Sequence, residues 1–233
     1  MTVRERETGT PRRVSTRVTR LLLGGGVIAG PLYVLVAVAQ AATRDGFDIR
    51  RHAVSLLSNG EWGWIQVTNF VVVGALVVLA AAGIARMLGA RRGGTWGPRL
   101  IGVYGLSLVA SGLLAADPAF GFPIGTPDGP PADATWQGVG HLVAGGIGFT
   151  ALVSACFVFA RHPIDDNRGW SAYSATTGVV FFGSFAAVAA GGGAGWANLT
   201  FTAGVVLAWT WLSLTTGIMF AKLGDTTPER GVE

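Results

Sequence analysis

The sequence contains a single cysteine, Cys156, among 233 residues. One cysteine excludes disulfides within the chain and every zinc motif that needs several cysteines. The spacings HExxH and HxxxH are also absent, so the chain carries no compact metal-binding motif. Charged side chains make up only 13% of the residues, whereas about 25% is usual in globular proteins. Because 50% of the residues are hydrophobic and the mean hydropathy is +0.50, this is not the composition of a soluble domain.

The scarce charges leave uncharged runs long enough to cross a membrane. A bilayer core of about 30 Å needs about 20 apolar residues in a helix. Four runs fit one crossing each, at residues 21–43, 62–85, 100–116 and 134–160. The run 169–221 has 53 residues without a charge, which suits two crossings separated by the glycine-rich turn 191–198. The sequence therefore predicts an all-α, polytopic membrane protein, a six-transmembrane-helix bundle with no charge near any span centre.

The positive charges are divided unequally between the two ends of these spans. Lys and Arg are retained on the cytoplasmic side, so their counts in the short loops predict orientation. With both termini cytoplasmic, 14 of the 17 lie inside and three outside, namely Arg44, Arg50 and Arg51. We expect a basic, disordered tail at 1–20, a transmembrane domain at 21–220 and a second cytoplasmic tail at 221–233, in the cell (inner or plasma) membrane. The pI near 10.0 then reflects contact with anionic membrane lipids and not with nucleic acid.

The first span has a second interpretation. Its arginine-rich lead, its apolar core and the tripeptide Ala37-Val38-Ala39 are typical of a secretory signal with a cleavage site. Its 23 uncharged residues exceed the roughly 7 to 15 of a usual signal core, which favours a retained span.

The segment RRHAVSLLSNGEWGWIQVTNF, residues 50–70, is unusually polar for a connection between two apolar runs. Its residues 52–59 would form one or two helical turns with polar side chains on one side and Ala and Leu on the other. Such a short helix at a membrane surface needs protein or water around its backbone. We therefore expect a polar vestibule on the outer face, with the Pro- and Gly-rich stretch 117–138 as a lid.

Asp117 ends the third predicted span and precedes Pro118, which disfavours helix at the residue before it. A carboxylate at a helix C-terminus faces the negative end of the dipole, so a compensating partner is expected. The candidates on the same side are Arg50, Arg51, His52 and His141. His141 lies near the start of the fourth span, where the dipole disfavours the imidazolium, so we expect a neutral imidazole bonded to Asp117.

Three hypotheses for function remain open. In the first, the vestibule binds a lipid or other amphiphile for sensing, scaffolding or transport, and the ligand-binding residues are Arg50, Arg51, His52, Ser55, Asn69, Asp117 and His141. The arginine pair could then meet a lipid phosphate. In the second, His52, Asp117 and His141 hold a metal in a membrane hydrolase. In the third, the chain is a structural subunit that binds a second copy of itself or another membrane subunit. No residue pattern implies a cofactor, and no catalytic residue can be named, which favours a role other than enzyme.

A series of short motifs adds a resemblance to a known family. In chain order they are Ser55-Leu56-Leu57-Ser58, Gly63-Trp64, Asn69-Phe70, Gly74, Asp117-Pro118, Gly140-His141 and Trp170 with Tyr173-Ser174. Their order and spacing resemble the DUF998 family of prokaryotic integral membrane proteins over spans one to five, and more weakly over span six. The resemblance implies a multi-helix membrane protein without an established molecular function, and it supplies no catalytic residue.

Overall fold

The structure, a computed structural model, describes residues 16–131, 133–164 and 167–225, and this part of the chain is helical without a strand. The six α-helices are α1 (Thr16–Thr43), α2 (Gly63–Leu88), α3 (Trp96–Leu113), α4 (Trp136–Arg161), α5 (Arg168–Ala190) and α6 (Gly195–Asp225). A short 3-10 helix, η1 (Val54–Ser58), lies between α1 and α2. The predicted all-α class is confirmed, and the predicted helical turns within 52–59 correspond to η1.

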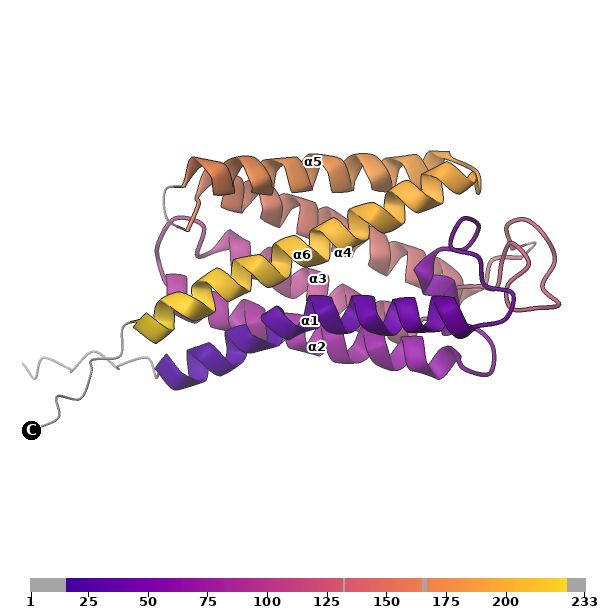
Figure 1. Ribbon diagram of the computed structural model, residues 1–233, viewed down its shortest axis with the longest axis horizontal. Coiled ribbons are helices and arrows are strands. Elements are labelled where there is room, and N and C mark those ends of the chain that lie inside the picture. Colours follow the sequence, from indigo (N-terminus) through magenta and orange to yellow (C-terminus); the bar gives the residue numbers. More distant parts are fainter. Residues whose placement is uncertain (1–15, 132, 165–166, 226–233) are drawn as a thin grey trace, which may run out of the picture.

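The six helices run antiparallel in chain order and form a closed ring (Figure 1). Each helix packs against the next one along the chain, and α6 packs against α1. One end of the ring, which we call the arginine-rich end, carries Arg86, Arg91, Arg92, Arg99, Arg161 and Arg168. The opposite end, the loop end, carries the connections 44–62 and 114–135 and the turn 191–194. Both long connections therefore lie on the same side of the ring.

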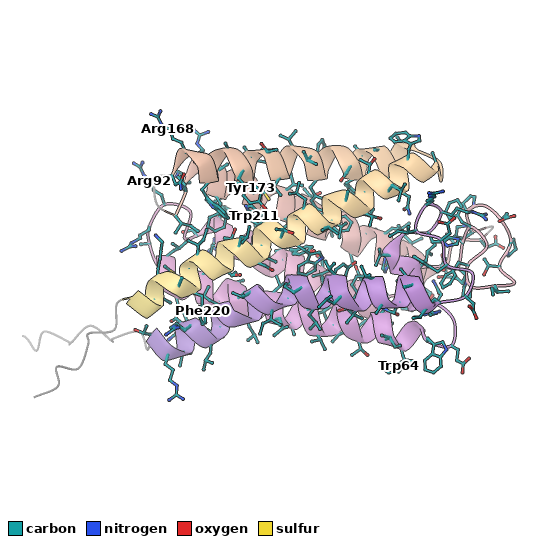
Figure 2. The ribbon with its side chains drawn as sticks, in the orientation of Figure 1. Trp64, Arg92, Arg168, Tyr173, Trp211 and Phe220 are labelled. Atoms are coloured by element: carbon teal, nitrogen blue, oxygen red, sulfur yellow. The ribbon has the colours of Figure 1, made fainter. Side chains whose placement is uncertain are left out.

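Helices α1, α2, α4, α5 and α6 are each long and apolar enough to cross a membrane. Exposed tryptophans lie at both ends of the ring: Trp62, Trp64, Trp136 and Trp196 at the loop end and Trp96 at the arginine-rich end. Figure 2 shows Trp64 at one end and Arg92 and Arg168 at the other. Tryptophan and arginine at the helix ends are typical of the two membrane interfaces. The protein is therefore a multi-pass membrane protein.

Several helix boundaries differ from the predicted ones. Helix α1 begins at Thr16 and not at residue 21, and α6 continues to Asp225. Packing explains the extension, since the Arg20 guanidinium lies 4.6 Å from the centroid of the Phe220 ring and continues the contact between α1 and α6 beyond the apolar runs. Of the predicted tails 1–20 and 221–233, residues 1–15 and 226–233 lie outside the described residues. Helix α3 spans 96–113 where 100–116 was expected, and it is not among the five helices that are long and apolar enough to cross a membrane.

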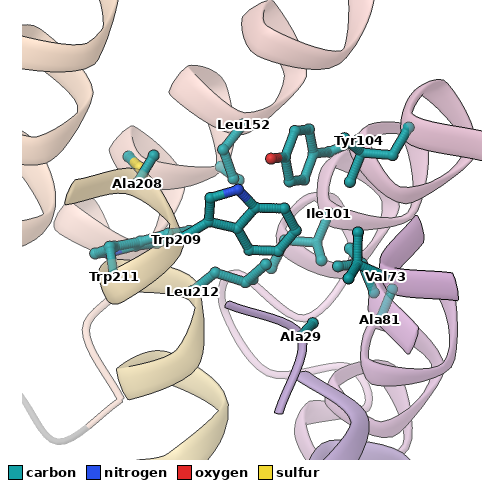
Figure 3. Close-up of a cluster of buried hydrophobic side chains, with 14 of the residues drawn as sticks. Ala29, Val73, Ala81, Ile101, Tyr104, Leu152, Ala208, Trp209, Trp211 and Leu212 are labelled. Carbon is teal, nitrogen blue, oxygen red and sulfur yellow. The ribbon is translucent and has the colours of Figure 1, made fainter. Parts of the chain in front are cut away.

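Aromatic side chains of α6 fill the centre of the ring (Figure 3). Trp209 stacks on Tyr33 with 4.9 Å between ring centroids and tilts against Tyr104 at 5.6 Å. Trp211 packs against Phe159, and its N–H donates to the Ser174 hydroxyl at 3.0 Å. The two indoles thus connect α6 to α1, α3, α4 and α5 in the middle of the bundle.

Helices α2 and α3 approach each other through a reciprocal pair of glycines. A Cβ added to Gly74 would lie 2.7 Å from the carbonyl oxygen of Gly105, and a Cβ added to Gly105 would lie 2.8 Å from the carbonyl oxygen of Gly74. Both neighbours are backbone atoms, which cannot move aside. Close backbone approach of this kind provides the van der Waals packing that holds helices together in lipid.

This contact predicts that Gly105→Ala lowers the free energy of unfolding by about 1–3 kcal/mol, because the added methyl group overpacks the α2–α3 contact. Gly102→Ala on the same helix is the matched control, since its Cβ would meet only the Ala81 methyl at 3.6 Å. Thermal unfolding of both variants in detergent checks the expectation. Equal midpoints for the two would contradict it.

Candidate functional site

Two adjoining cavities lie at the loop end of the ring. The deep cavity, of about 480 Å³, is lined by residues from all six α-helices and the start of η1. The mouth cavity, of about 320 Å³, lies between η1, the connection 114–135 and the starts of α4 and α6. The two share Ala53, Ser55, His141, Leu142 and Val188 in their walls. Both volumes fall within the range of ligand pockets, about 300–1,000 Å³.

The deep cavity is mainly apolar and reaches the surface of the bundle. Phe149 contacts Phe185 and Phe201 with ring centroids 5.2 and 5.5 Å apart and forms part of its wall. Leu142 of α4 and Ala189 of α5 also line the cavity although both are exposed. The cavity therefore reaches the surface where the first turns of α4 lie beside the last turn of α5, toward the loop end.

His141 lies where the two cavities adjoin and is buried against the end of α3. Its Nδ1 is 2.9 Å from the carbonyl oxygens of Ser111 and Leu114. Since carbonyl oxygens only accept, Nδ1 carries a proton and donates to both. The last carbonyls of a helix lack partners within the helix, so His141 caps α3. In the neutral imidazole Nε2 therefore holds the lone pair.

Asp117 has a different partner from the one predicted. Its carboxylate accepts from the Thr135 N–H at 2.9 Å and from the Thr135 hydroxyl at 2.5 Å. The same hydroxyl accepts from the N–H of Gly138 and caps α4. Asp117 therefore lies at the positive end of the α4 dipole, which stabilises a carboxylate.

The expectation that Asp117 pairs with Arg50, Arg51, His52 or His141 is wrong, because α3 ends at Leu113 and not at Asp117. The three intervening residues carry the carboxylate away from the negative end of α3 and across to the start of α4. No compensating cation is then needed.

His52 holds the two long connections together. Its Nδ1 accepts from the Asp48 N–H and its Nε2 donates to the Phe120 carbonyl, both at 2.9 Å. Asn198 of α6 donates to the carbonyl of His52 at 2.9 Å and to that of Ile49 at 2.6 Å. Both imidazole nitrogens of this buried side chain are thus engaged with backbone, and neither has a lone pair left for a metal.

The predicted metal triad is not assembled. His52 is bonded to backbone at both nitrogens, Asp117 to Thr135, and His141 to the end of α3. Within residues 16–131, 133–164 and 167–225, no group of three or more His, Cys, Asp or Glu side chains is placed to hold a metal ion. The geometry of the described residues therefore gives no basis for a three-ligand zinc site.

The other predicted site residues are divided between the cavity walls and other surfaces. Ser55 lines both cavities. Arg51 lines the mouth cavity and pairs with Asp128 at 2.7 Å, with the two side chains 53% and 83% exposed. Such an exposed pair contributes little to stability. Arg50 is exposed and its backbone lies against Gly195 at the start of α6.

Asn69 lines neither cavity and belongs to a buried cluster of three amides. Its Nδ2 donates to the Tyr33 carbonyl at 3.3 Å and to Gln66 Oε1 at 3.4 Å. Gln40 Nε2 donates to the same Gln66 oxygen at 2.8 Å. The cluster joins α1 to α2, which agrees with amide bonding between membrane helices. Sequence reasoning missed Gln40, although an amide inside a long apolar run was a visible signal.

Arg44 is a second residue whose role was missed. Its guanidinium donates to the carbonyls of Leu57 at 3.2 Å and Asn59 at 2.6 Å, and it lies 5.3 Å from the centroid of the Phe122 ring. Partial burial removes water from the guanidinium and lowers the pKa of Arg44 from its ordinary value. Arg44 fixes the C-terminal end of η1, and η1 covers the deep cavity.

The role of His52 predicts that His52→Phe destabilises the loop end while keeping an aromatic ring in place. The variant leaves the Asp48 N–H and the Phe120 carbonyl without partners, at a cost of about 1–3 kcal/mol for each group that stays buried. Hydrogen exchange of the Asp48 amide should become faster, as measured by mass spectrometry. His162→Phe at the arginine-rich end is the control and should leave this exchange unchanged; an unchanged rate in His52→Phe itself would refute the assignment.

Comparison with known proteins places the chain in a family but not in a functional class. Searches of curated proteins and of solved structures each returned no significant match. The family described as "Protein of unknown function (DUF998)" matches residues 27–217, which run from within α1 to within α6 and include both cavities. Since the match covers most of the chain, the protein belongs to the DUF998 family.

Proposed function

We propose that this protein binds a single-tailed lipid or a similar amphiphile in the two adjoining cavities, in a non-enzymatic role such as sensing, scaffolding or transport. One observation carries the proposal: an apolar cavity of about 480 Å³ reaches the surface of the bundle at Leu142 of α4 and Ala189 of α5. A ligand pocket is usually a mainly apolar cavity with a few convergent polar groups, and the deep cavity has this character.

The position of the opening favours a ligand that arrives from the bilayer. A lipid tail in the membrane can enter between Leu142 and Ala189 without crossing water. The headgroup then lies against the polar side chains of the deep cavity, which adjoins the mouth cavity at Ser55 and His141. Because lipid tails are already out of water, apolar burial adds little driving force, and polar contacts at the cavity must supply the selectivity.

Cavity filling tests this function. Gly146 lines the deep cavity, and a Cβ added there meets nothing within 4 Å. Gly146→Leu should therefore leave the fold intact and reduce binding of the ligand tail. Gly183→Leu on α5 is the matched control, because a Cβ on this exposed glycine also meets nothing within 4 Å and Gly183 lines neither cavity.

The measurement is photo-crosslinking in nanodiscs that contain a single-tailed glycerol lipid with a diazirine in its tail, followed by peptide mapping. Labelling should fall on lining peptides of α4 and α5, and should drop about ten-fold or more in Gly146→Leu but not in Gly183→Leu. Labelling that spreads evenly over the outer surface, or that is unaffected by Gly146→Leu, would contradict the proposal.

We also propose that all six helices cross the inner or plasma membrane with both termini in the cytoplasm. Helix α3 is about 27 Å long at 1.5 Å per residue and lies between α2 and α4 in the ring, which supports a sixth crossing. The excess of Lys and Arg outside the two long connections supports this orientation. The arginine-rich end then faces the cytoplasm.

Single-cysteine labelling tests the orientation in a Cys156→Ala background. Glu61→Cys places a thiol at the loop end and Arg92→Cys places one at the arginine-rich end, both at exposed positions. A membrane-impermeant maleimide should label the first variant in intact cells and the second only after permeabilisation. Labelling of only Arg92→Cys in intact cells would show the opposite orientation. Labelling of both variants in intact cells would rule out the proposed crossings.

A further inference from the structure

Seven polar groups line the deep cavity without a protein partner. They are the hydroxyls of Tyr33, Ser55, Tyr104, Ser107 and Ser111, the indole N–H of Trp209 and Nε2 of His141. None forms a hydrogen bond within the described part of the chain, and none is sealed inside the surrounding packing. Buried polar groups are normally hydrogen-bonded, so a set of unpaired groups around one cavity points to an external partner.

The serines of this cavity differ from other hydroxyls in the same bundle. Thr150, Ser154 and Thr210 each donate to the backbone carbonyl four residues earlier, at 2.8 Å. This local bond satisfies a helical hydroxyl without a ligand. Ser107 and Ser111 do not form it, although both lie inside α3. Their hydroxyls are therefore available to a molecule in the cavity.

These groups form a row along the cavity. Tyr104, Ser107 and Ser111 lie on one face of α3 at spacings of three and four residues, over about 10 Å of helix. Tyr33 and Trp209 lie beside Tyr104 at the deep end of this row, where Figure 3 shows the indole nitrogen of Trp209 near the Tyr104 hydroxyl. His141 contacts the Ser111 carbonyl at the opposite end of the row.

The charge of the lining restricts the ligand further. No Asp, Glu, Lys or Arg belongs to the described lining of the deep cavity. Arg51 lines only the mouth cavity and is paired with Asp128. A phosphate or carboxylate in the deep cavity would lose its hydration without gaining a counter-charge, which is strongly unfavourable.

We propose that the deep cavity selects an uncharged, hydroxyl-bearing lipid, because its wall offers seven unpaired hydrogen-bonding groups and no charged side chain. This inference rests on the proposed amphiphile-binding function and specifies the class of its ligand. A ligand hydroxyl accepts from the tyrosine, serine and indole donors, and it donates to Nε2 of His141 when that nitrogen holds the lone pair of a neutral imidazole. A fully ionised phosphate or sulfate offers no proton to that nitrogen.

Native mass spectrometry of the full-length protein with three lipids that share an oleoyl or oleyl tail tests the selection. The probes are monooleoylglycerol, oleyl sulfate and oleoyl lysophosphatidate. Monooleoylglycerol should bind at least about ten-fold more tightly than either anionic lipid. Tyr104→Phe and the double variant Ser107→Ala/Ser111→Ala should weaken monooleoylglycerol binding about five-fold for each hydrogen bond lost and leave the weak anionic binding unchanged.

Thr210→Ala is the matched control for the serine variants, because it removes an exposed hydroxyl that already bonds to the Val206 carbonyl. Thermal unfolding of every variant shows whether weaker binding results from a lost hydrogen bond or from a destabilised protein. Tyr104→Phe keeps the aromatic ring and therefore its packing. Anionic lipids that bind as tightly as monooleoylglycerol would overturn the inference and leave the amphiphile-binding function in place. If the folded serine and tyrosine variants bind monooleoylglycerol with unchanged affinity, these side chains do not form the proposed hydrogen bonds to the ligand. If none of the three lipids binds, both proposals are wrong.

Discussion

The geometry of the loop end depends on one capping interaction, the donation of His141 Nδ1–H to the carbonyls at the end of α3. In a membrane a free helix carbonyl has no water to bond, so a helix must end where a side chain can satisfy it. His141 provides that group opposite Ser111 and Leu114, and α3 ends at Leu113. The chain then extends across to the start of α4, where Asp117 accepts from Thr135. The same imidazole leaves Nε2 at the boundary between the two cavities.

The cavity exists because the ring is filled unequally along its length. In the arginine-rich half, large side chains such as Trp211, Phe159 and Ile101 fill the space between helices. In the loop half, glycines of α4 and short side chains of α5 leave it open beneath η1. A second small core of Leu56, Leu57, Ala119 and Phe122 then holds the two long connections over the cavity. The cover is therefore a packed structure with its own buried side chains and hydrogen bonds.

In the described part of the chain, the polar groups that bond within the protein are distinct from the unpaired groups that line the deep cavity. The amides of Gln40, Gln66 and Asn69 and the rings of His52 and Trp211 bond within the protein and hold elements together. The hydroxyls of Tyr104, Ser107 and Ser111 have no such partners in the described chain. Unpaired polar atoms are not confined to the cavity, because Gln40 Oε1, Gln66 Nε2 and Asn69 Oδ1 of the amide cluster are buried without a partner in the described chain.

The sequence by itself determined much of the architecture. The bilayer sets the length of the uncharged runs and the position of the tryptophans at their ends, so both can be recognised without knowing which helices contact each other. Five long apolar helices, the helical turns near residue 55 and the all-α class were predictable in this way. The partner of Asp117 and the roles of His52 and Arg44 were not, since each depends on which segments meet across the ring. Ser107 and Ser111 read in the sequence as ordinary small residues of a membrane helix. Only the tertiary structure decided that they line a cavity, because whether a helix face meets a neighbour or open space is set by the packing of all six helices together.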